Sequence, residues 1–221
     1  MKDKIYRFEK KIFLENKYID AYQDLIKNVN YNFRKTYPER KINNVYFDNE
    51  ELDFLFENIE GLSNRKKIRI RWYGECFGKI NANLEYKIKN GNVGYKEIFK
   101  DIKFELSKES KLKYLLKKNM NKIIERKLES YQPILFNRYT RNYFETSNNE
   151  IRITIDEDIY SKRLFSNSKI SYKKKDKSEI VILEIKYSNN MDIETINNQL
   201  DYKFQVHKHS KYVYGTLNSY L

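Results

Sequence analysis

The sequence is poor in the residues that break or cross-link a chain: among 221 residues there are one cysteine, two prolines and six glycines. The single cysteine, Cys76, excludes an internal disulfide and is consistent with a reducing compartment. Together with His207 and His209 it cannot supply a zinc ligand set at a usual spacing. The sequence has neither an apolar signal core at its start nor a bilayer-spanning apolar run, so we expect a soluble, cytoplasmic protein.

Negative charge is scarce relative to positive charge. Lys and Arg number 44 against 31 Asp and Glu, which gives a net charge of +13. Such an excess indicates an anionic partner, for example nucleic acid, a lipid headgroup surface or a phosphorylated small molecule. The hydrophobic content of 40% and aromatic content of 15% argue against disorder. Because no linker or repeat divides the chain, we expect a single domain over residues 1–221.

The most informative stretch is Lys-Ile-Arg-Ile-Arg-Trp-Tyr-Gly at residues 67–74, where charged and apolar side chains alternate strictly. Side chains of a strand point to opposite faces with period two, so this segment has one apolar and one cationic face. The same split recurs in strands that we expect at residues 5–14, 81–89, 150–158 and 180–188. Their charged positions include Arg7, Glu9, Lys11, Glu85, Lys87, Arg152, Glu184 and Lys186.

Helical spacing of apolar residues predicts helices over residues 18–33, 50–59 and 108–131, and another from 193 toward 211. Their apolar stripes need a surface to cover, and the apolar strand faces are the obvious one. The charged faces would then point inward, and closure of the sheet would line a polar tunnel with them. We therefore expect an α+β fold, an antiparallel β-barrel tunnel with amphipathic helices packed on the outside.

Smaller signals mark the ends of elements. Further strands are expected at residues 43–47 and 134–145, Asp48 or Asn49 is a candidate helix cap, and Asn90-Gly91 favours a tight hairpin turn. Trp72 is expected in the outer core because it lies on the apolar side of its strand. The lysine run at residues 173–175 reads as a solvated loop.

Like charges around a tunnel would repel one another unless a polyanion or a metal neutralised them. Arginine suits phosphate because its guanidinium donates two parallel hydrogen bonds, whereas lysine acts as a mobile point charge. The candidates are Arg69, Arg71, Arg141, Arg152, Lys11, Lys87, Lys186 and Lys211. The carboxylates Glu9, Glu85 and Glu184 could hold Mn²⁺ or Mg²⁺, which take oxygen ligands. Taken alone, Glu184 and Lys186 could equally be a solvated cross-strand pair.

Several motifs together resemble one family. They are Arg7-x-Glu9-x-Lys11, Asn44-Val-Tyr-Phe-Asp48, Ile68-Arg-Ile-Arg-Trp-Tyr-Gly74, Leu84-Glu-Tyr-Lys87 and Leu183-Glu-Ile-Lys186. In this order they resemble the VTC domain, the catalytic module of the vacuolar transporter chaperone polyphosphate polymerase in the triphosphate tunnel metalloenzyme (CYTH-like) superfamily. The resemblance implies a tunnel that binds ATP or another nucleoside triphosphate, uses Mn²⁺ or Mg²⁺, and transfers the γ-phosphoryl group onto polyphosphate.

The resemblance also implies roles for individual residues. The catalytic, phosphate-contacting set is Arg69, Arg71, Lys87, Arg141, Arg152 and Lys211, with Glu184 as the catalytic metal ligand, Lys11 and Lys186 as further phosphate contacts, and Glu9 and Glu85 as further metal candidates. Arg138 competes with Arg141, but only Arg141 matches the family's arginine. Arg7 stands where the superfamily's hydrolases carry a first Glu, which makes a two-metal hydrolytic site less favourable.

Two alternatives stay open: a hydrolase of inorganic triphosphate or nucleoside triphosphates on the same scaffold, and a noncatalytic polyanion binder with a steep salt dependence. The partners expected are a nucleoside triphosphate, polyphosphate and a separate membrane protein, since the membrane helices of the eukaryotic proteins are missing from this sequence. Sequence-specific nucleic-acid binding is not expected, because no helix has the basic face of a recognition helix.

Overall fold

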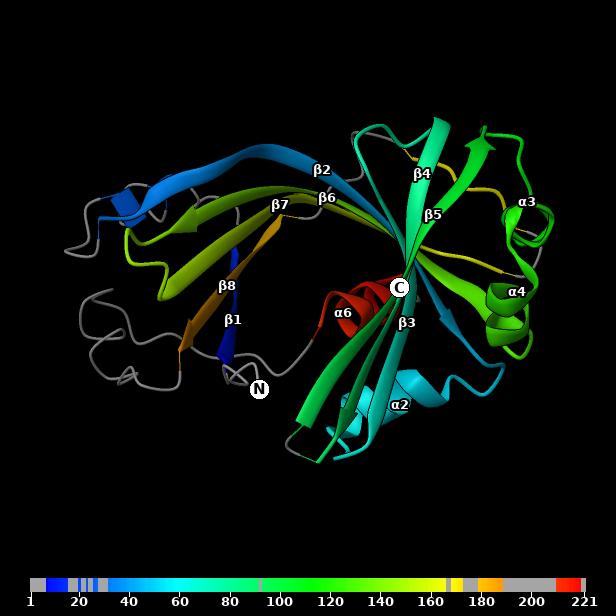
Figure 1. Ribbon diagram of the computed structural model, residues 1–221, viewed down its shortest axis with the longest axis horizontal. Helices are drawn as coiled ribbons and strands as arrows, with labels where there is room; N and C mark the ends of the chain where they lie inside the picture. The colour runs from blue at the N-terminus through cyan, green and yellow to red at the C-terminus, as the bar shows by residue number, and fades with distance from the viewer. Residues whose placement is uncertain are drawn as a thin grey trace. The chain divides into compact units, whose positions relative to one another are not determined.

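The computed structural model describes residues 7–15, 20, 23, 26–27, 32–91, 93–165, 168–172, 179–188 and 210–219. Its strands are β1 (Arg7–Glu15), β2 (Arg34–Asp48), β3 (Arg65–Tyr73), β4 (Gly78–Asn90), β5 (Val93–Leu106), β6 (Gln132–Glu145), β7 (Ile151–Arg163) and β8 (Ile180–Ser188). Its helices are α2 (Asp53–Glu60), α3 (Leu112–Asn119), α4 (Lys122–Leu128) and α6 (Lys211–Asn218), as Figure 1 shows.

The strands form one eight-stranded sheet in the order β1-β8-β7-β6-β2-β3-β4-β5. Every pairing whose register is described is antiparallel. The predicted α+β class with an antiparallel sheet and few helices is therefore confirmed. Among the described residues the two end strands, β1 and β5, do not pair with each other, so the sheet is open and the closed barrel is not confirmed.

Two compact units divide the chain, and each is described by itself. Unit 1 consists of Met1–Arg40, Thr140–Ile159 and Ser178–Lys208, and unit 2 of Lys41–Tyr139, Tyr160–Lys177 and His209–Leu221. The single domain expected from the sequence stays a prediction.

In unit 1 the strands β1, β8 and β7 pair as antiparallel neighbours. Their apolar residues alternate with charged ones and form a buried cluster that includes Ile12, Ile153, Leu183 and Ile185. The alternation predicted for these three strands is thus confirmed, and it leaves the charged side chains on the opposite face.

In unit 2 the strands β3, β4 and β5 form a meander whose apolar face joins a larger core. Ile68, Ile70 and Trp72 are each 1% exposed, as the alternation in residues 67–74 predicts. The Trp72 ring packs against Phe104 and Phe136, with centroids 6.3 and 6.1 Å away. Trp72 therefore belongs to the core, as expected.

Helix boundaries differ from the expectation in two places. The helix expected over residues 108–131 is two helices, because the backbone at Met120 is extended and the Asn121 side chain starts α4 by accepting from the Ile124 amide at 2.9 Å. The α2 helix begins at Asp53, and the carboxylate of Asp48 accepts from the amides of Phe54 and Leu55. Asp48 thus satisfies backbone amides in the first turn of α2 from outside the helix, which is what a capping residue does.

Several predicted helices and loops fall in parts of the chain of which the structure describes few residues or none. Of the helix expected over residues 18–33, Asp20, Gln23, Ile26 and Lys27 are helical, and most of the others lie outside the described residues. The helix from 193, His207, His209 and the loop 173–175 also lie outside them. No helix in the described part of the chain is both long and apolar enough to cross a bilayer.

Candidate functional site

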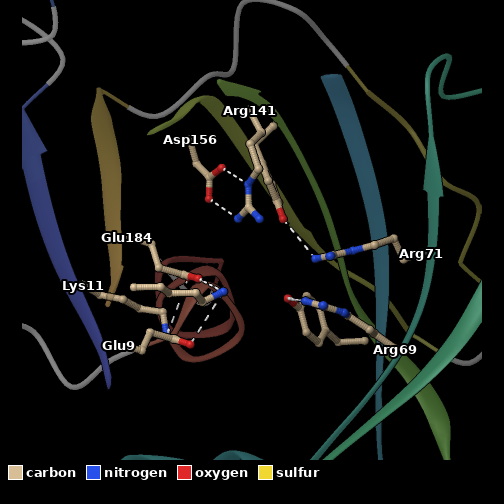
Figure 2. Close-up of polar contacts among 10 residues, drawn as sticks. Glu9, Lys11, Arg69, Arg71, Arg141, Asp156 and Glu184 are labelled. Atoms are coloured by element: carbon tan, nitrogen blue, oxygen red, sulfur yellow. Dashed lines mark hydrogen bonds and ion pairs between the residues drawn. The ribbon is translucent and has the colours of Figure 1, made fainter. Parts of the chain in front are cut away.

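Two arginines on β3 in unit 2 are held in fixed positions by their neighbours (Figure 2). Arg71 is 8% exposed and donates from Nε to Asn44 Oδ1 at 2.8 Å and from Nη2 to the Tyr139 hydroxyl at 3.1 Å. Both partners are neutral. Arg69 donates to Glu85 Oε2 from Nε at 2.7 Å and to the Tyr46 hydroxyl from Nη1 at 3.3 Å. The two guanidiniums therefore stand on successive same-face positions of one strand.

Glu85 joins this arginine pair to a lysine on the neighbouring strand. Its second oxygen accepts from Lys96 Nζ at 2.6 Å, and its side chain is 6% exposed. Burial acts to raise the pKa of the Glu85 carboxyl, but the charges of Arg69 and Arg71 and the contact with Lys96 lower that pKa to about 2. Desolvation lowers the pKa of the Lys96 ammonium against the opposing effect of Glu85. The carboxylate therefore stays ionised over the physiological range.

Lys87 of β4 lies in a row of cations. The register places it opposite Lys67 on β3 and opposite Lys96 on β5. Lys87 is exposed. The predicted phosphate contact thus sits among like charges on the face that carries Arg69 and Arg71, which raises the local positive potential.

The α6 helix presents Lys211, the last of the predicted phosphate contacts. Ser210 caps the helix by accepting from the Val213 amide at 3.3 Å. Lys211 is 8% exposed, and its ammonium lies 5.1 Å from the centre of the Tyr139 ring. The hydroxyl of the same tyrosine accepts from Arg71. Lys211 and Arg71 therefore meet at one aromatic side chain.

The next residue, Tyr212, fixes α6 to β2. Its hydroxyl donates to Asp48 Oδ2 at 2.5 Å, and its ring stacks on Tyr46 with centroids 5.1 Å apart. Burial raises the pKa of the Asp48 carboxyl, although hydrogen bonds from Tyr212 and from backbone amides oppose the rise. Behind the helix, a Cβ added at Gly215 would lie 2.6 Å from Ser161 Oγ. Only glycine allows so close an approach, so the position of Lys211 is tightly specified.

In unit 1 four charged residues of β1 and β8 form an alternating cluster (Figure 2). The register pairs Glu9 with Lys186 and Lys11 with Glu184. Lys186 Nζ lies 2.6 Å from Glu184 Oε1 and 3.9 Å from Glu9 Oε2. Lys11 contacts Glu9 and lies 4.0 Å from Glu184 Oε2. Each carboxylate is therefore shared between two ammonium groups, and Glu184 is the more buried, with 9% of its side chain exposed.

The two arginines predicted in unit 1 are each paired with a buried carboxylate. Arg141 binds Asp156 through two bonds, from Nε at 2.5 Å and from Nη2 at 2.7 Å, and Asp156 is fully buried. Arg152 donates from Nε to Glu145 at 2.5 Å, while 48% of its own side chain stays exposed. These carboxylates orient the two guanidiniums on their strands.

The competing candidate, Arg138, has a different environment. It donates to Asn43 and to the carbonyl of Gly74, and it lies 5.1 Å from the Tyr172 ring. It therefore helps to fasten the turn after β3 in unit 2.

Whether these residues suit a divalent cation can be tested on unit 1. Among the described residues no group of three or more His, Cys, Asp or Glu side chains comes together. Glu184 and Glu9 do lie together, and Thr154, opposite Glu184 in the register, has a buried hydroxyl oxygen without a hydrogen-bond partner. Mg²⁺ is commonly held by one or two carboxylates with substrate phosphates and water completing the shell. The residues fit a cation of that kind.

Glu85 fits a metal less well. Both of its oxygens are engaged by cationic side chains, Arg69 on one and Lys96 on the other. Its role as a metal ligand stays a prediction that these contacts do not favour. Cys76 is buried, and desolvation raises the pKa of its thiol to about 11, which keeps it in the unreactive thiol form.

Sequence reasoning missed four residues that complete the unit 2 cluster: Asn44, Tyr46, Tyr139 and Lys96. The hairpin signal would have missed Lys96, because a turn made by Asn90 and Gly91 would place Gly94 opposite Lys87. The register instead pairs Asn90 with Val93 across the turn, and so places Lys96 opposite Lys87. The others require pairings between strands distant in sequence, which no local pattern supplies.

Comparison with known proteins gives a family match and likenesses to solved structures. The family described as the VTC domain matches residues 6–220. A solved structure from Vibrio parahaemolyticus, provisionally described as an adenylate cyclase, is 12% identical over 88% of this chain and 83% of its own, with a TM-score of 0.46. A likeness of that strength carries no argument here. Among curated proteins nothing matches.

Proposed function

The chain belongs to the VTC domain family, and on that premise we propose that it is a metal-dependent polyphosphate polymerase that transfers the γ-phosphoryl group of ATP onto a polyphosphate chain. The family supports the coarser part of this proposal, an enzyme that handles phosphoryl groups of triphosphates. The choice of donor, acceptor and metal is the proposal's own.

The observation that carries the proposal is the environment of Arg71. Its guanidinium is buried, yet among the described residues its hydrogen bonds go to the neutral oxygens of Asn44 and Tyr139. A buried charge is costly unless an opposite charge or good hydrogen bonds compensate it. The carboxylate of Glu85 acts on Arg71 through its charge without a hydrogen bond between them, and a phosphate oxygen would supply an opposite charge in direct contact. We assign the phosphate contacts of unit 2 to Arg69, Arg71, Lys87 and Lys211.

Unit 1 supplies the second requirement, acidic oxygens for a cation. We assign Glu184, with help from Glu9, to hold Mn²⁺ or Mg²⁺, and Arg141, Arg152, Lys11 and Lys186 to further phosphate contacts. A bound divalent cation would neutralise charge on the phosphate oxygens. The lysines that bridge the carboxylates are ammonium donors, the kind of group that binds phosphate oxygens.

The proposed reaction needs no covalent enzyme intermediate. A terminal oxygen of polyphosphate, ionised at neutral pH, attacks the γ-phosphorus of ATP in line. The bond from that phosphorus to the β–γ bridging oxygen breaks, its electron pair leaves with ADP, and polyphosphate gains one phosphate. Arg69 and Arg71 would hold the equatorial oxygens while charge redistributes, which is the main demand of phosphoryl transfer.

The test is the product formed from ATP and Mn²⁺. The proposal expects long polyphosphate chains, resolved by gel electrophoresis, together with ADP. Orthophosphate alone would instead support the runner-up, a triphosphate hydrolase on the same scaffold. Binding of polyphosphate without any turnover, weakened steeply by salt and indifferent to metal, would support a noncatalytic polyanion binder.

Two further expectations belong to this proposal. One is a tunnel lined by the charged faces of the strands. The described strand pairings neither require nor exclude that tunnel, because they do not join β1 to β5. The other is a partnership with a separate membrane protein that would couple synthesis to transport. A pull-down with detergent-solubilised membranes of the source cells tests the second expectation.

A further inference from the structure

An aromatic cluster that the sequence did not signal lies beside Arg141 in unit 1. Tyr37 and Tyr143 meet edge to face, with ring centroids 5.5 Å apart and planes at 81°. The Arg40 guanidinium lies 4.9 Å from the centre of the Tyr37 ring and 5.5 Å from that of Tyr143. The Tyr143 ring is in turn 6.0 Å from the guanidinium of Arg141. The four contacts make one continuous chain from Arg141 to Tyr37.

Tyr37 is strongly exposed for an aromatic residue with two such neighbours. Its exposed fraction is 47%, and the surrounding residues of β2 up to Arg40 are mostly exposed too. Tyr143 is partly buried and is two residues from Arg141 on β6, so both side chains belong to the same face of that strand. The cluster thus extends the charged face outward from Arg141 and ends in an accessible ring.

A nucleoside triphosphate matches this order of a cation followed by aromatic rings. Its phosphates need cationic donors, and its base, separated from them by the ribose, has a flat π-face that stacks on aromatic rings and guanidinium planes. Arg141, oriented by Asp156, suits the first requirement, and Tyr37 with Arg40 suits the second. Polyphosphate has no base, so a phosphate-only ligand would leave Tyr37 and Arg40 unexplained.

Resting on the proposed function, we propose that Tyr37, supported by Arg40 and Tyr143, is the stacking site for the base of the donor nucleotide. Stacking uses the π-face that every base has, so the site favours nucleoside triphosphates over bare triphosphate without selecting strongly among bases. A purine nucleotide should bind with higher affinity than a pyrimidine nucleotide, because the purine base offers a larger face for stacking.

The test compares two ligands that differ in the base. Affinities of ATP and of inorganic tripolyphosphate are measured by titration calorimetry with the full chain, in EDTA so that neither ligand turns over. Tyr37→Ala should weaken ATP binding about tenfold, as expected for the loss of one base–aromatic contact. Its affinity for tripolyphosphate should stay at the wild-type value. Tyr37→Phe, which keeps the ring, should bind both ligands as the wild type does.

A matched control is Tyr95→Ala. Tyr95 is a similarly exposed tyrosine, at 52%, but lies on β5 in unit 2, and its loss should affect neither ligand. If Tyr37→Ala changes the two affinities equally, or changes neither, the base-stacking role is overturned while the proposed function stands. If the wild type binds neither ATP nor tripolyphosphate, the proposed function itself fails, and this inference with it.

Discussion

The charged clusters of the two units differ in how their charges are balanced. In unit 1 each predicted cation touches a carboxylate: Lys11 and Lys186 contact Glu9 and Glu184, Arg141 contacts Asp156, and Arg152 contacts Glu145. In unit 2 one carboxylate, Glu85, contacts both Arg69 and Lys96, while Arg71 relies on neutral oxygens. Among the described contacts, the predicted unit 1 cations are therefore each paired with a carboxylate, whereas the buried guanidinium of Arg71 in unit 2 is hydrogen-bonded to neutral oxygens.

This difference indicates a division of tasks. A buried guanidinium whose hydrogen-bond partners are neutral favours anion binding directly, so the Arg71 region of unit 2 is suited to hold phosphates whether or not a metal is present. A balanced cluster attracts an anion less strongly by itself, but its carboxylates can accept a cation. On the proposed function, affinity for the substrate would therefore depend mostly on unit 2 and metal-dependent turnover on unit 1.

The largest effect is expected from Glu184→Gln in unit 1. Loss of the charged metal ligand should lower turnover of ATP about a thousandfold, the scale of several kcal/mol of lost charge stabilisation. The affinity for tripolyphosphate in EDTA should remain near the wild-type value, because the unit 2 cations are intact. Steady-state kinetics with Mn²⁺ and calorimetry measure the two quantities. Glu150→Gln, at an exposed residue of unit 1, is the control. Equal activity of the two variants would contradict the assignment of metal-dependent turnover to Glu184.

A smaller and opposite pattern is expected from Arg71→Lys in unit 2. The ammonium keeps the charge but loses the planar fork that binds Asn44 and Tyr139. Charged hydrogen bonds contribute about 1.5–3 kcal/mol, so kcat/KM should fall about 10- to 100-fold. The Mn²⁺ concentration that gives half-maximal activity should not change. Arg126→Lys, exposed on α4, should have normal kinetics. A shifted Mn²⁺ requirement in Arg71→Lys would argue against the separation of tasks.

The third prediction concerns pH and Glu85, the carboxylate that contacts Arg69 and Lys96 in unit 2. Because the pKa of Glu85 is lowered from 4.5 to about 2, its ionised form stabilises the folded state above pH about 4.5. That contribution, about 3 kcal/mol for this shift, is lost as the pH falls from 4.5 toward 2. In Glu85→Gln the free energy of unfolding should start lower and decline less over this window. Urea unfolding followed by circular dichroism at several pH values checks it, and parallel curves would contradict it.

The smallest effect is expected from Tyr212→Phe, which removes the hydroxyl bound to the buried carboxylate of Asp48. The loss should cost about 1–2 kcal/mol and lower Tm by about 2–6 °C. Because Tyr212 also positions Lys211, tripolyphosphate should bind a few times more weakly than to the wild type. Tyr95→Phe, on an exposed ring, is the control. An unchanged Tm would show that Asp48 finds another donor.

The sequence predicts the fold best where apolar and charged residues alternate without interruption. The strands around residues 67–74, 81–89 and 180–188 are of this kind, and all three are present. Period two needs only local information, since each side chain's face follows from its position along the strand. The same alternation predicts that Arg69 and Arg71 share one face of their strand.

The strand β5 was missed for an identifiable reason. Its buried apolar residues Ile102, Phe104 and Leu106 occupy even positions, but Phe99, packed against the same core, is odd. The register shifts opposite Ala82 and Leu84, and Asp101 has a positive φ of 62°. A bulge thus inserts one residue and reverses the alternation halfway along the strand. A fixed period of two cannot recognise such a strand.

For the candidate site, the residue types were predictable but their partners were not. The charged positions follow from alternation and from the family resemblance, whereas the contacts of Arg141 with Asp156 and of Arg71 with Tyr139 join different strands. Those contacts depend on strand order and register, which long-range pairing decides. The roles assigned to these residues in catalysis stay predictions.

One consequence follows from the place of Trp72, the chain's single tryptophan. It is 1% exposed in the core of unit 2, and its indole nitrogen donates to the carbonyl of Glu75 at 3.1 Å. Intrinsic fluorescence excited at the indole therefore arises from unit 2 alone. A shift of the emission maximum on heating therefore reports the unfolding of unit 2 without a contribution from tryptophan in unit 1. Set beside circular dichroism, which follows both units, it distinguishes the unfolding of unit 2 from that of unit 1.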